Sequence, residues 1–240
     1  IKKLNYVFSV DIENCMYPIE KNDIILYTQF WCYLLCYSLN EKEECEKIYD
    51  NISSIDFYNN GFIKYSKKYK HFYSVPNIMP MLALLEIIHT GKKTYKYNKI
   101  INKLSETMIN GNWCYLKKSN NVWIKTQNYE DLSHQIMMYV CFIKLKEFDK
   151  SELLNNIIKN LEKSIIKCIE DTYDKNIKQR DIGWNIPWTT FALIKINPNH
   201  RLCSYYKKQL LNTQGVKHEN YRVRAISSYV LATLKVSNMV

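Results

Sequence analysis

His134 is the residue best placed to carry acid–base chemistry. It lies three positions after Asp131, where an apolar stretch begins that runs to Leu145. A helix beginning at Asp131 places His134 in its first turn, beside the positive end of the helix dipole, where a neutral imidazole can accept a proton. Abstraction of a proton by a positioned histidine is a common form of general base catalysis. A helix-start histidine that only hydrogen-bonds a carboxylate explains the same position without catalysis.

Glu130 and Asp131 form a carboxylate pair beside this histidine. Such a pair can supply a general acid when burial raises the pKa of one member. Asp131 also fits the N-cap of the following helix, where its side chain accepts a backbone hydrogen bond. Because adjacent side chains usually point apart, we do not expect both carboxylates to serve one reaction.

Arginines lie in two segments that precede or open later apolar stretches. They are Arg180, and Arg222 and Arg224 in the run HENYRVR, which also contains His218 and Tyr221. A guanidinium binds a carboxylate through two parallel hydrogen bonds and stabilises negative charge that develops on it. For Arg180, a surface ion pair with Asp181 is the competing interpretation.

Aromatic side chains gather at the same places in the sequence. Trp113, Tyr115, Trp123, Trp184 and Trp188 precede or open apolar stretches. Their ring faces suit the C–H groups of a sugar ring, while Tyr and Trp edges can still hydrogen-bond. For Trp188 taken alone, core packing is the favoured interpretation. Tyr115, Tyr129 and Tyr221 are each candidates for a proton donor, and the sequence does not choose among them.

Five apolar stretches recur along the chain and must position these residues. They are Asp23–Leu39, Asn77–Ile88, Asp131–Leu145, Asn185–Ile196 and Tyr221–Leu234. The first four begin about 54 residues apart and the fifth begins about 36 residues later. Charged, amphipathic segments lie between them. A buried helix followed by an amphipathic one at such a period is typical of stacked αα-hairpins.

We therefore predict an all-α fold in which αα-hairpins form a complete or incomplete toroid. Residues 1–22 read as a short irregular lead-in and 23–240 as a single domain. The expected outer helices are Glu41–Asp50, Lys96–Ile109, Ser151–Thr172 and Arg201–Asn212. Each long connection precedes an inner helix, so we expect these loops, and a site, to gather on one face. The segment Asn110–Tyr129 reads as a loop or a short hairpin.

The amino-acid composition is consistent with a helical fold and limits the kinds of partner that the protein can bind. Only five Gly and five Pro occur among 240 residues, and 47% of residues are hydrophobic. No apolar run reaches the roughly 18–20 residues of a membrane span. The net charge of +11 favours an acidic polymer or a solvated basic face. No nucleic-acid-binding motif is visible. None of the eight cysteines forms a CxxC pair, so we predict no metal and no other cofactor, and most cysteines read as small buried hydrophobic residues.

Three short motifs resemble those of toroidal enzymes that act on polysaccharides. They are NWCY at 112–115, NYEDLSH at 128–134 and GWNIPW at 183–188. Toroidal polysaccharide lyases, unsaturated-glucuronyl hydrolases and glucuronyl C5-epimerases carry a W-x-Y loop and a D-x-x-H helix start beside the sugar cleft. The resemblance covers roughly residues 70–235. The run Trp113-Cys114-Tyr115 also looks like the zinc-binding element of lanthionine cyclases, but Leu116 replaces the expected glycine and no Cys-His pair follows.

The resemblance implies a β-elimination lyase for a uronate-containing polysaccharide. His134 would be the base, a tyrosine the acid, and Arg180 or Arg222 would hold the substrate carboxylate. C5-epimerisation shares the proton abstraction and stays open. Trp113, Trp123, Trp184, Trp188, Glu130, Asp131, Arg224 and His218 are the expected substrate-binding residues. The alternatives are a glycoside hydrolase that uses a carboxylate acid and a non-catalytic module that binds a partner through a basic, aromatic face. Localisation and oligomeric state are left open.

Overall fold

Eight α-helices dominate the part of the chain that the structure describes. This computed structural model describes residues 26–53, 58–59, 62–63, 73–74, 78–113, 116–119, 122–125, 132–175 and 182–212. The helices are α1 (Leu26–Ser38), α2 (Lys42–Ser53), α3 (Ile78–Thr90), α4 (Tyr95–Thr107), α5 (Leu132–Leu145), α6 (Glu152–Asp174), α7 (Ile182–Ile196) and α8 (Cys203–Asn212). The predicted all-α class is confirmed. The predicted lead-in and the fifth apolar stretch lie outside the described residues.

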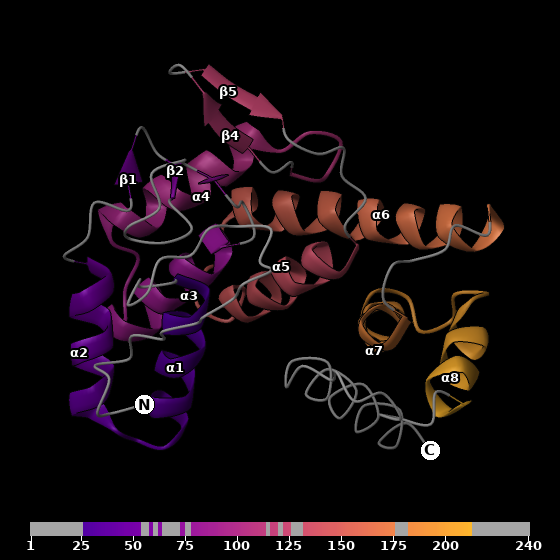
Figure 1. Cartoon of the computed structure of the whole chain (residues 1–240), viewed down its shortest axis with the longest axis horizontal. Helices are drawn as coiled ribbons and strands as arrows, with labels where there is room; N and C mark the ends of the chain where they lie inside the picture. The colour runs from indigo at the N-terminus through magenta and orange to yellow at the C-terminus, as the bar shows by residue number, and fades with distance from the viewer. Residues whose placement is uncertain are drawn as a thin grey trace, which may run out of the picture. The chain divides into compact units, whose positions relative to one another are not determined.

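The predicted alternation of inner and outer helices is also confirmed. In α3 every residue from Ile78 to Ile87 is buried, as expected for a helix apolar on all sides. In α4, by contrast, Tyr97, Ile100, Ile101 and Leu104 alone form the buried stripe. α1 packs on both α2 and α3 (Figure 1), and α3 in turn packs on α4. The α7–α8 pair packs in the same way.

Local sequence signals set the ends of α3 and α4. Pro80 lies in the first turn of α3, where its missing N–H costs nothing. Gly91, with φ of +67°, follows the last turn, and its N–H donates to the carbonyl of Ile87. Thr94 caps α4 because its hydroxyl accepts from the N–H of Tyr97 at 3.1 Å.

The start of α7 differs from the prediction. The sequence predicts an apolar helix over Asn185–Ile196, whereas the helix begins three residues earlier, at Ile182, and holds Pro187 inside it. Pro187 therefore interrupts the backbone hydrogen-bond ladder by one donor. Three residues later, the hydroxyl of Thr190 donates to the carbonyl of Ile186 at 2.8 Å.

Short strands occur in two of the long connections. Between α2 and α3 lie β1 (Tyr58–Asn59), β2 (Phe62–Ile63) and β3 (Tyr73–Ser74), and between α4 and α5 lie β4 (Leu116–Ser119) and β5 (Val122–Lys125). β1 and β2 pair with each other, and β3, β4 and β5 form an antiparallel sheet in that order. The hairpin expected within Asn110–Tyr129 is therefore present. Because β3 pairs with β4, the connections that precede α3 and α5 meet, as predicted.

The helices divide between two compact units. Unit 1 contains Ile1–Tyr129 and Cys141–Ile157, and unit 2 contains Glu130–Val140 and Ile158–Val240. Both α5 and α6 contribute to each unit. The single domain over 23–240 and the closed or open ring concern the placement of all hairpins together, and both stay predictions.

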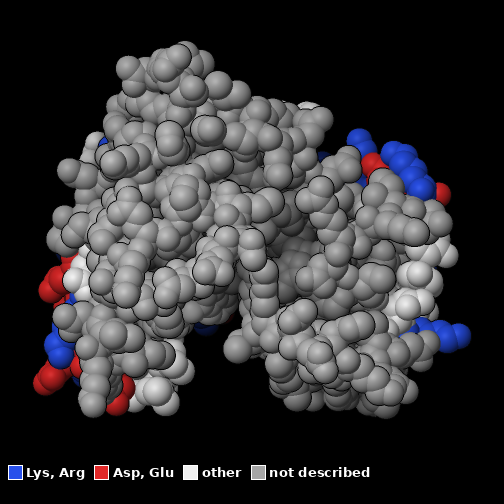
Figure 2. All heavy atoms as spheres, viewed as in Figure 1, with Lys and Arg blue, Asp and Glu red and all other residues white. Residues whose placement is uncertain are grey.

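The described cysteines are free thiols, and the described charged side chains are mixed in sign on the face shown in Figure 2. Six thiols are free, and all are buried except that of Cys168, which is half-buried. On the face shown in Figure 2, described Lys and Arg side chains lie among Asp and Glu side chains rather than in one basic patch. None of the described helices combines the length and apolar character that a membrane span requires.

Candidate functional site

His134 lies where the sequence placed it, in the first turn of α5. It is the third residue of the helix, and its side chain is half-buried. The helix begins at Leu132, so Asp131 occupies the position just before it, although Asp131 itself lies outside the described residues. A histidine here is accessible to solvent and sits among the free backbone N–H groups of the helix end.

Most other predicted site residues lie outside the described part of the chain. These are Tyr115, Tyr129, Glu130, Asp131, Arg180, His218, Tyr221, Arg222 and Arg224. Trp123 belongs to β5 and Trp184 to α7, but their side chains are outside the description as well. Whether His134 shares a cleft with these residues therefore stays a prediction.

Trp113 has a structural environment rather than a sugar-stacking one. Its indole N–H donates to the carbonyl of Leu104 at 2.8 Å, and its ring stacks on Phe142 with centroids 5.8 Å apart. Trp188 is also buried and meets Phe191 edge to face at 6.2 Å. Burial of both rings argues against the predicted sugar-stacking role, because a ligand needs an exposed ring face.

Gln135, which the sequence analysis overlooked, is the polar neighbour of His134. Its side chain is only 3% exposed, and its Oε1 accepts no hydrogen bond from the described residues. A buried acceptor left without a donor costs about 1–3 kcal/mol. A ligand hydroxyl or another donor at this place would remove that cost.

A buried glutamine also occupies the fourth position of α1, the first inner helix. Gln29 is the fourth residue of α1, as Gln135 is of α5, and it is also buried. Both belong to the pattern Leu-x-x-Gln-x-x-x-Tyr, which ends at Tyr33 in α1 and at Tyr139 in α5. A search for polar residues at equal positions of the repeat would have found these glutamines.

Glu86 is a buried acid of unit 1. Its Oε1 accepts from Thr94 at 2.7 Å, and its Oε2 accepts from Tyr49 at 2.7 Å and lies 3.3 Å from Nζ of Lys96. Burial alone would raise the pKa of Glu86, but these donors outweigh it and hold the pKa below its usual value. In turn, burial and the bond to Glu86 raise the pKa of Tyr49 to about 12. Glu86 is therefore a saturated anion, unsuited to donate a proton.

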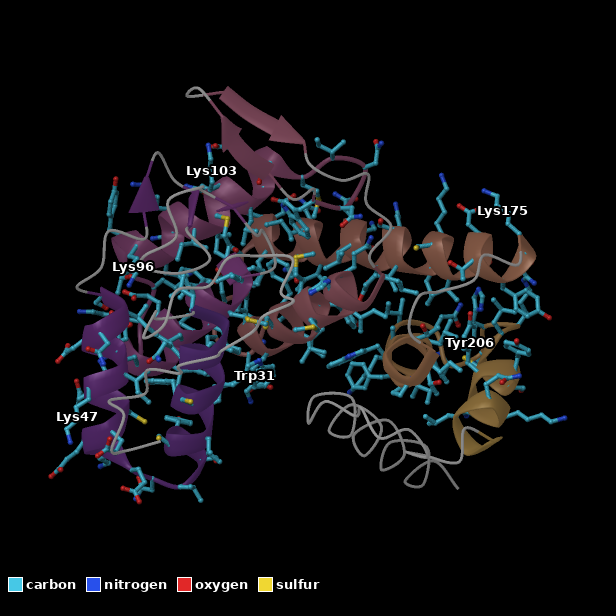
Figure 3. The ribbon with its side chains drawn as sticks, viewed as in Figure 1. Trp31, Lys47, Lys96, Lys103, Lys175 and Tyr206 are labelled. Atoms are coloured by element: carbon cyan, nitrogen blue, oxygen red, sulfur yellow. The ribbon has the colours of Figure 1, made fainter. Side chains whose placement is uncertain are left out.

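His89 lies beside this network and joins the first two hairpins. Its ring stacks on Tyr49 with centroids 3.6 Å apart, and its Nδ1 lies 3.2 Å from the hydroxyl of Tyr33. Its Nε2 lies 3.5 Å from Glu46. The contacts come from α1 and α2, whereas His89 is in the last turn of α3. Lys96, labelled in Figure 3, extends the same network from the start of α4.

Asp149 fills the equivalent place in the connection between α5 and α6. Its carboxylate accepts from Tyr97 at 2.8 Å, from Lys93 at 3.0 Å and from the N–H of Ser151 at 2.9 Å. Burial would raise the pKa of Asp149, but these three donors hold it below its usual value. The bond to Asp149, together with burial, raises the pKa of Tyr97.

The residues around the short α3–α4 and α5–α6 connections therefore differ in chemistry from those at the start of α5. At the short connections, Glu86 and Asp149 have their oxygens filled and act as structural anchors. At the start of α5, the side chain of His134 is half-buried, and the buried Oε1 of Gln135 accepts no hydrogen bond from the described residues. Within the described ranges, no three His, Cys, Asp or Glu side chains are arranged to hold a metal ion. The start of α5 is the better candidate for a reacting site.

The comparisons with known proteins add little to this picture. No protein-family model matches the chain, and no curated protein matches it. Among solved structures, the chain is similar to one described as a novel alpha-amylase from Clostridium perfringens, at 13% identity and a TM-score of 0.45. That likeness covers 96% of this chain and 89% of the other. At this TM-score it supports no conclusion about fold or function.

Proposed function

We propose that the chain acts on an acidic, uronate-containing polysaccharide by β-elimination, with His134 as the base. The observation that carries the proposal is the place of His134, half-buried in the first turn of α5. A base at this position can approach a substrate from solvent while the helix end supports nearby negative charge.

The reaction needs one proton removed and one returned. His134 takes the proton from the carbon next to the uronate carboxylate, and negative charge develops on that carboxylate. Arg180 or Arg222 pairs with it and stabilises the charge. The bond to the leaving sugar oxygen then breaks as a carbon–carbon double bond forms, and Tyr221, Tyr115 or Tyr129 protonates the oxygen. No electrons are exchanged with any other reactant.

Gln135 is not counted among the substrate-contacting residues, because its side chain is only 3% exposed. Trp184, Trp123, Glu130, Asp131, Arg224 and His218 are the further substrate-binding candidates. Trp113 and Trp188 support the core instead.

A glycoside hydrolase is less well supported. That chemistry requires a carboxylic acid with a raised pKa. Glu86 and Asp149, the acids that are buried among the described residues of unit 1, both have lowered pKa values. Epimerisation at the same carbon begins with the same proton abstraction and differs only in where the proton returns.

The test is to incubate the protein with polymers of glucuronate, galacturonate, mannuronate and iduronate. We expect ultraviolet absorbance from an unsaturated uronate to rise with at least one polymer. Solvent deuterium incorporated without chain cleavage would indicate the epimerase instead. If no polymer is cleaved or exchanges that proton, the proposed function is wrong.

A further inference from the structure

Tyr173, Arg201 and Tyr205 form an exposed cluster in unit 2 that the proposed reaction does not use. Tyr173 lies in the last turn of α6, Arg201 in the connection between α7 and α8, and Tyr205 in the first turn of α8. The two tyrosine rings meet edge to face, with centroids 4.9 Å apart and an interplanar angle of 75°. The guanidinium carbon of Arg201 lies 5.8 Å from the ring centroid of Tyr173. We refer to these three residues as the Tyr173 platform.

Buried residues pack behind Tyr205 in the Tyr173 platform. Tyr206, labelled in Figure 3, is buried and meets Tyr205 edge to face at 5.2 Å. Its carbonyl accepts from the hydroxyl of Thr190 in α7 at 3.3 Å. The ring face presented to solvent by Tyr205 is therefore fixed from behind by α7 and α8.

His200 holds the connection that carries Arg201. Its Nδ1 accepts from the N–H of Leu202 at 3.3 Å, so its proton is on Nε2, which lies 3.1 Å from Glu170 of α6. The backbone on either side of Arg201 is thus tied both to itself and to α6. A fixed guanidinium loses less freedom on binding a ligand.

Arg201 keeps donors for a ligand although it has an acidic neighbour. A single terminal nitrogen, Nη2, contacts both oxygens of Asp174, at 3.0 and 2.8 Å. Within the described part of the chain, its Nη1 and Nε donate no hydrogen bond to another residue. Exposed ion pairs of this kind are weak, so Nη1 or Nε can donate to a second carboxylate while Nη2 stays with Asp174.

The exposed rings and the unused N–H donors of Arg201 together favour one class of ligand. Tyr173 is 41% exposed and Tyr205 is 42% exposed, which leaves ring surface for the C–H face of a sugar. A charged guanidinium N–H donates a strong hydrogen bond to a carboxylate. A sugar that carries a carboxylate satisfies both features, whereas a neutral sugar satisfies only the rings.

We propose that the Tyr173 platform binds one uronate residue of an acidic polysaccharide, as a non-catalytic site built by elements other than the start of α5. The ligand class rests on the proposed function. The site anchors the polymer and raises its local concentration near the protein. Such an anchor lowers KM for long chains and leaves the chemical step unchanged.

The binding test uses the full chain with His134→Ala, so that bound polymer is not consumed. Calorimetry would compare a uronate oligosaccharide with its methyl ester, which has the same shape but no charge. We expect the ester to bind at least about tenfold more weakly, because a charge-assisted pair is lost. Arg201→Gln should remove that preference, and Arg201→Lys should restore only part of it.

Tyr205→Ala should weaken binding of the acid and the ester alike, by about three- to tenfold. Tyr95→Ala is the matched control, since Tyr95 is 83% exposed at the start of α4 in unit 1. Circular dichroism checks that each variant is folded. Unchanged affinity in both Arg201→Gln and Tyr205→Ala overturns the platform, as does equal binding of acid and ester.

The outcomes also separate this site from the proposed reaction. Arg201-dependent uronate binding by a wild-type protein that forms no unsaturated product supports the platform and removes the lyase. Product formation with binding that ignores Arg201 supports the lyase and removes the platform. Tighter Arg201-dependent binding of a single-stranded nucleic acid than of the uronate overturns the proposed ligand class.

Discussion

The hydroxyl of Tyr97 donates a 2.8 Å hydrogen bond to Oδ2 of Asp149, joining α4 to the connection that precedes α6. Both groups are buried, and the carboxylate also anchors the first turn of α6 through the N–H of Ser151. One acid therefore fixes the ends of two hairpins.

Tyr97→Phe should destabilise the protein by about 1–3 kcal/mol, because one oxygen of a buried carboxylate loses its donor. Urea unfolding followed by circular dichroism measures the change. Tyr95→Phe is the control, since Tyr95 lies two residues earlier on the exposed side of α4. An equal effect of both changes would contradict the assigned role of Tyr97.

Glu86 should make stability fall at acid pH. Its pKa is lowered in the folded protein, so its contribution is fully present above the unfolded value of about 4.3 and is lost as pH falls through the folded value. Glu86→Gln should flatten this part of the profile of unfolding free energy against pH. Glu106→Gln, at an exposed ion pair, should leave the profile unchanged. Matching profiles for Glu86→Gln and wild type would show that Glu86 is not the group responsible.

Trp113→Phe should reduce stability by about 1–3 kcal/mol, because the carbonyl of Leu104 loses the indole donor. Thermal unfolding measures this loss. Affinity for a uronate oligosaccharide should stay at the wild-type value, since the ring is buried. A variant with normal stability and weakened sugar binding would return Trp113 to the substrate-binding set.

Gln135→Met should leave stability unchanged or raise it slightly, since the change removes a buried acceptor without a donor. Methionine is already tolerated at the same position of α3, where Met81 is the fourth residue. Denaturant unfolding measures the change. A clear loss of stability would mean that the amide oxygen already has a partner.

The helical framework could be predicted because its signals are local. Apolar stretches set the inner helices, and Gly91 and Pro80 set the ends of α3 within a residue or two. The start of α7 was placed three residues late, because the apolar stretch begins at Asn185 whereas the helix begins at Ile182. The helix also contains Pro187, which removes one backbone donor from its interior.

The polar anchors and the platform could not be predicted, because they depend on residues far apart in the sequence. Glu86 meets Tyr49 across 37 positions, and Arg201 meets Asp174 across 27. Trp113 read as a cleft residue because it stands beside a loop, but its indole reaches back to α4. Only His134 could be placed from the sequence, since a helix start is itself a local signal.

The rate of formation of unsaturated uronate by wild type and by His134→Ala tests the central claim most directly. His89→Gln is the control, since His89 lies among Tyr33, Tyr49 and Glu46 and belongs to neither the proposed reaction nor the Tyr173 platform. Loss of a general base predicts a fall in kcat of about 10²–10⁴-fold for His134→Ala, with oligosaccharide affinity retained. A His134→Ala protein that is folded and forms product at the wild-type rate would contradict the account.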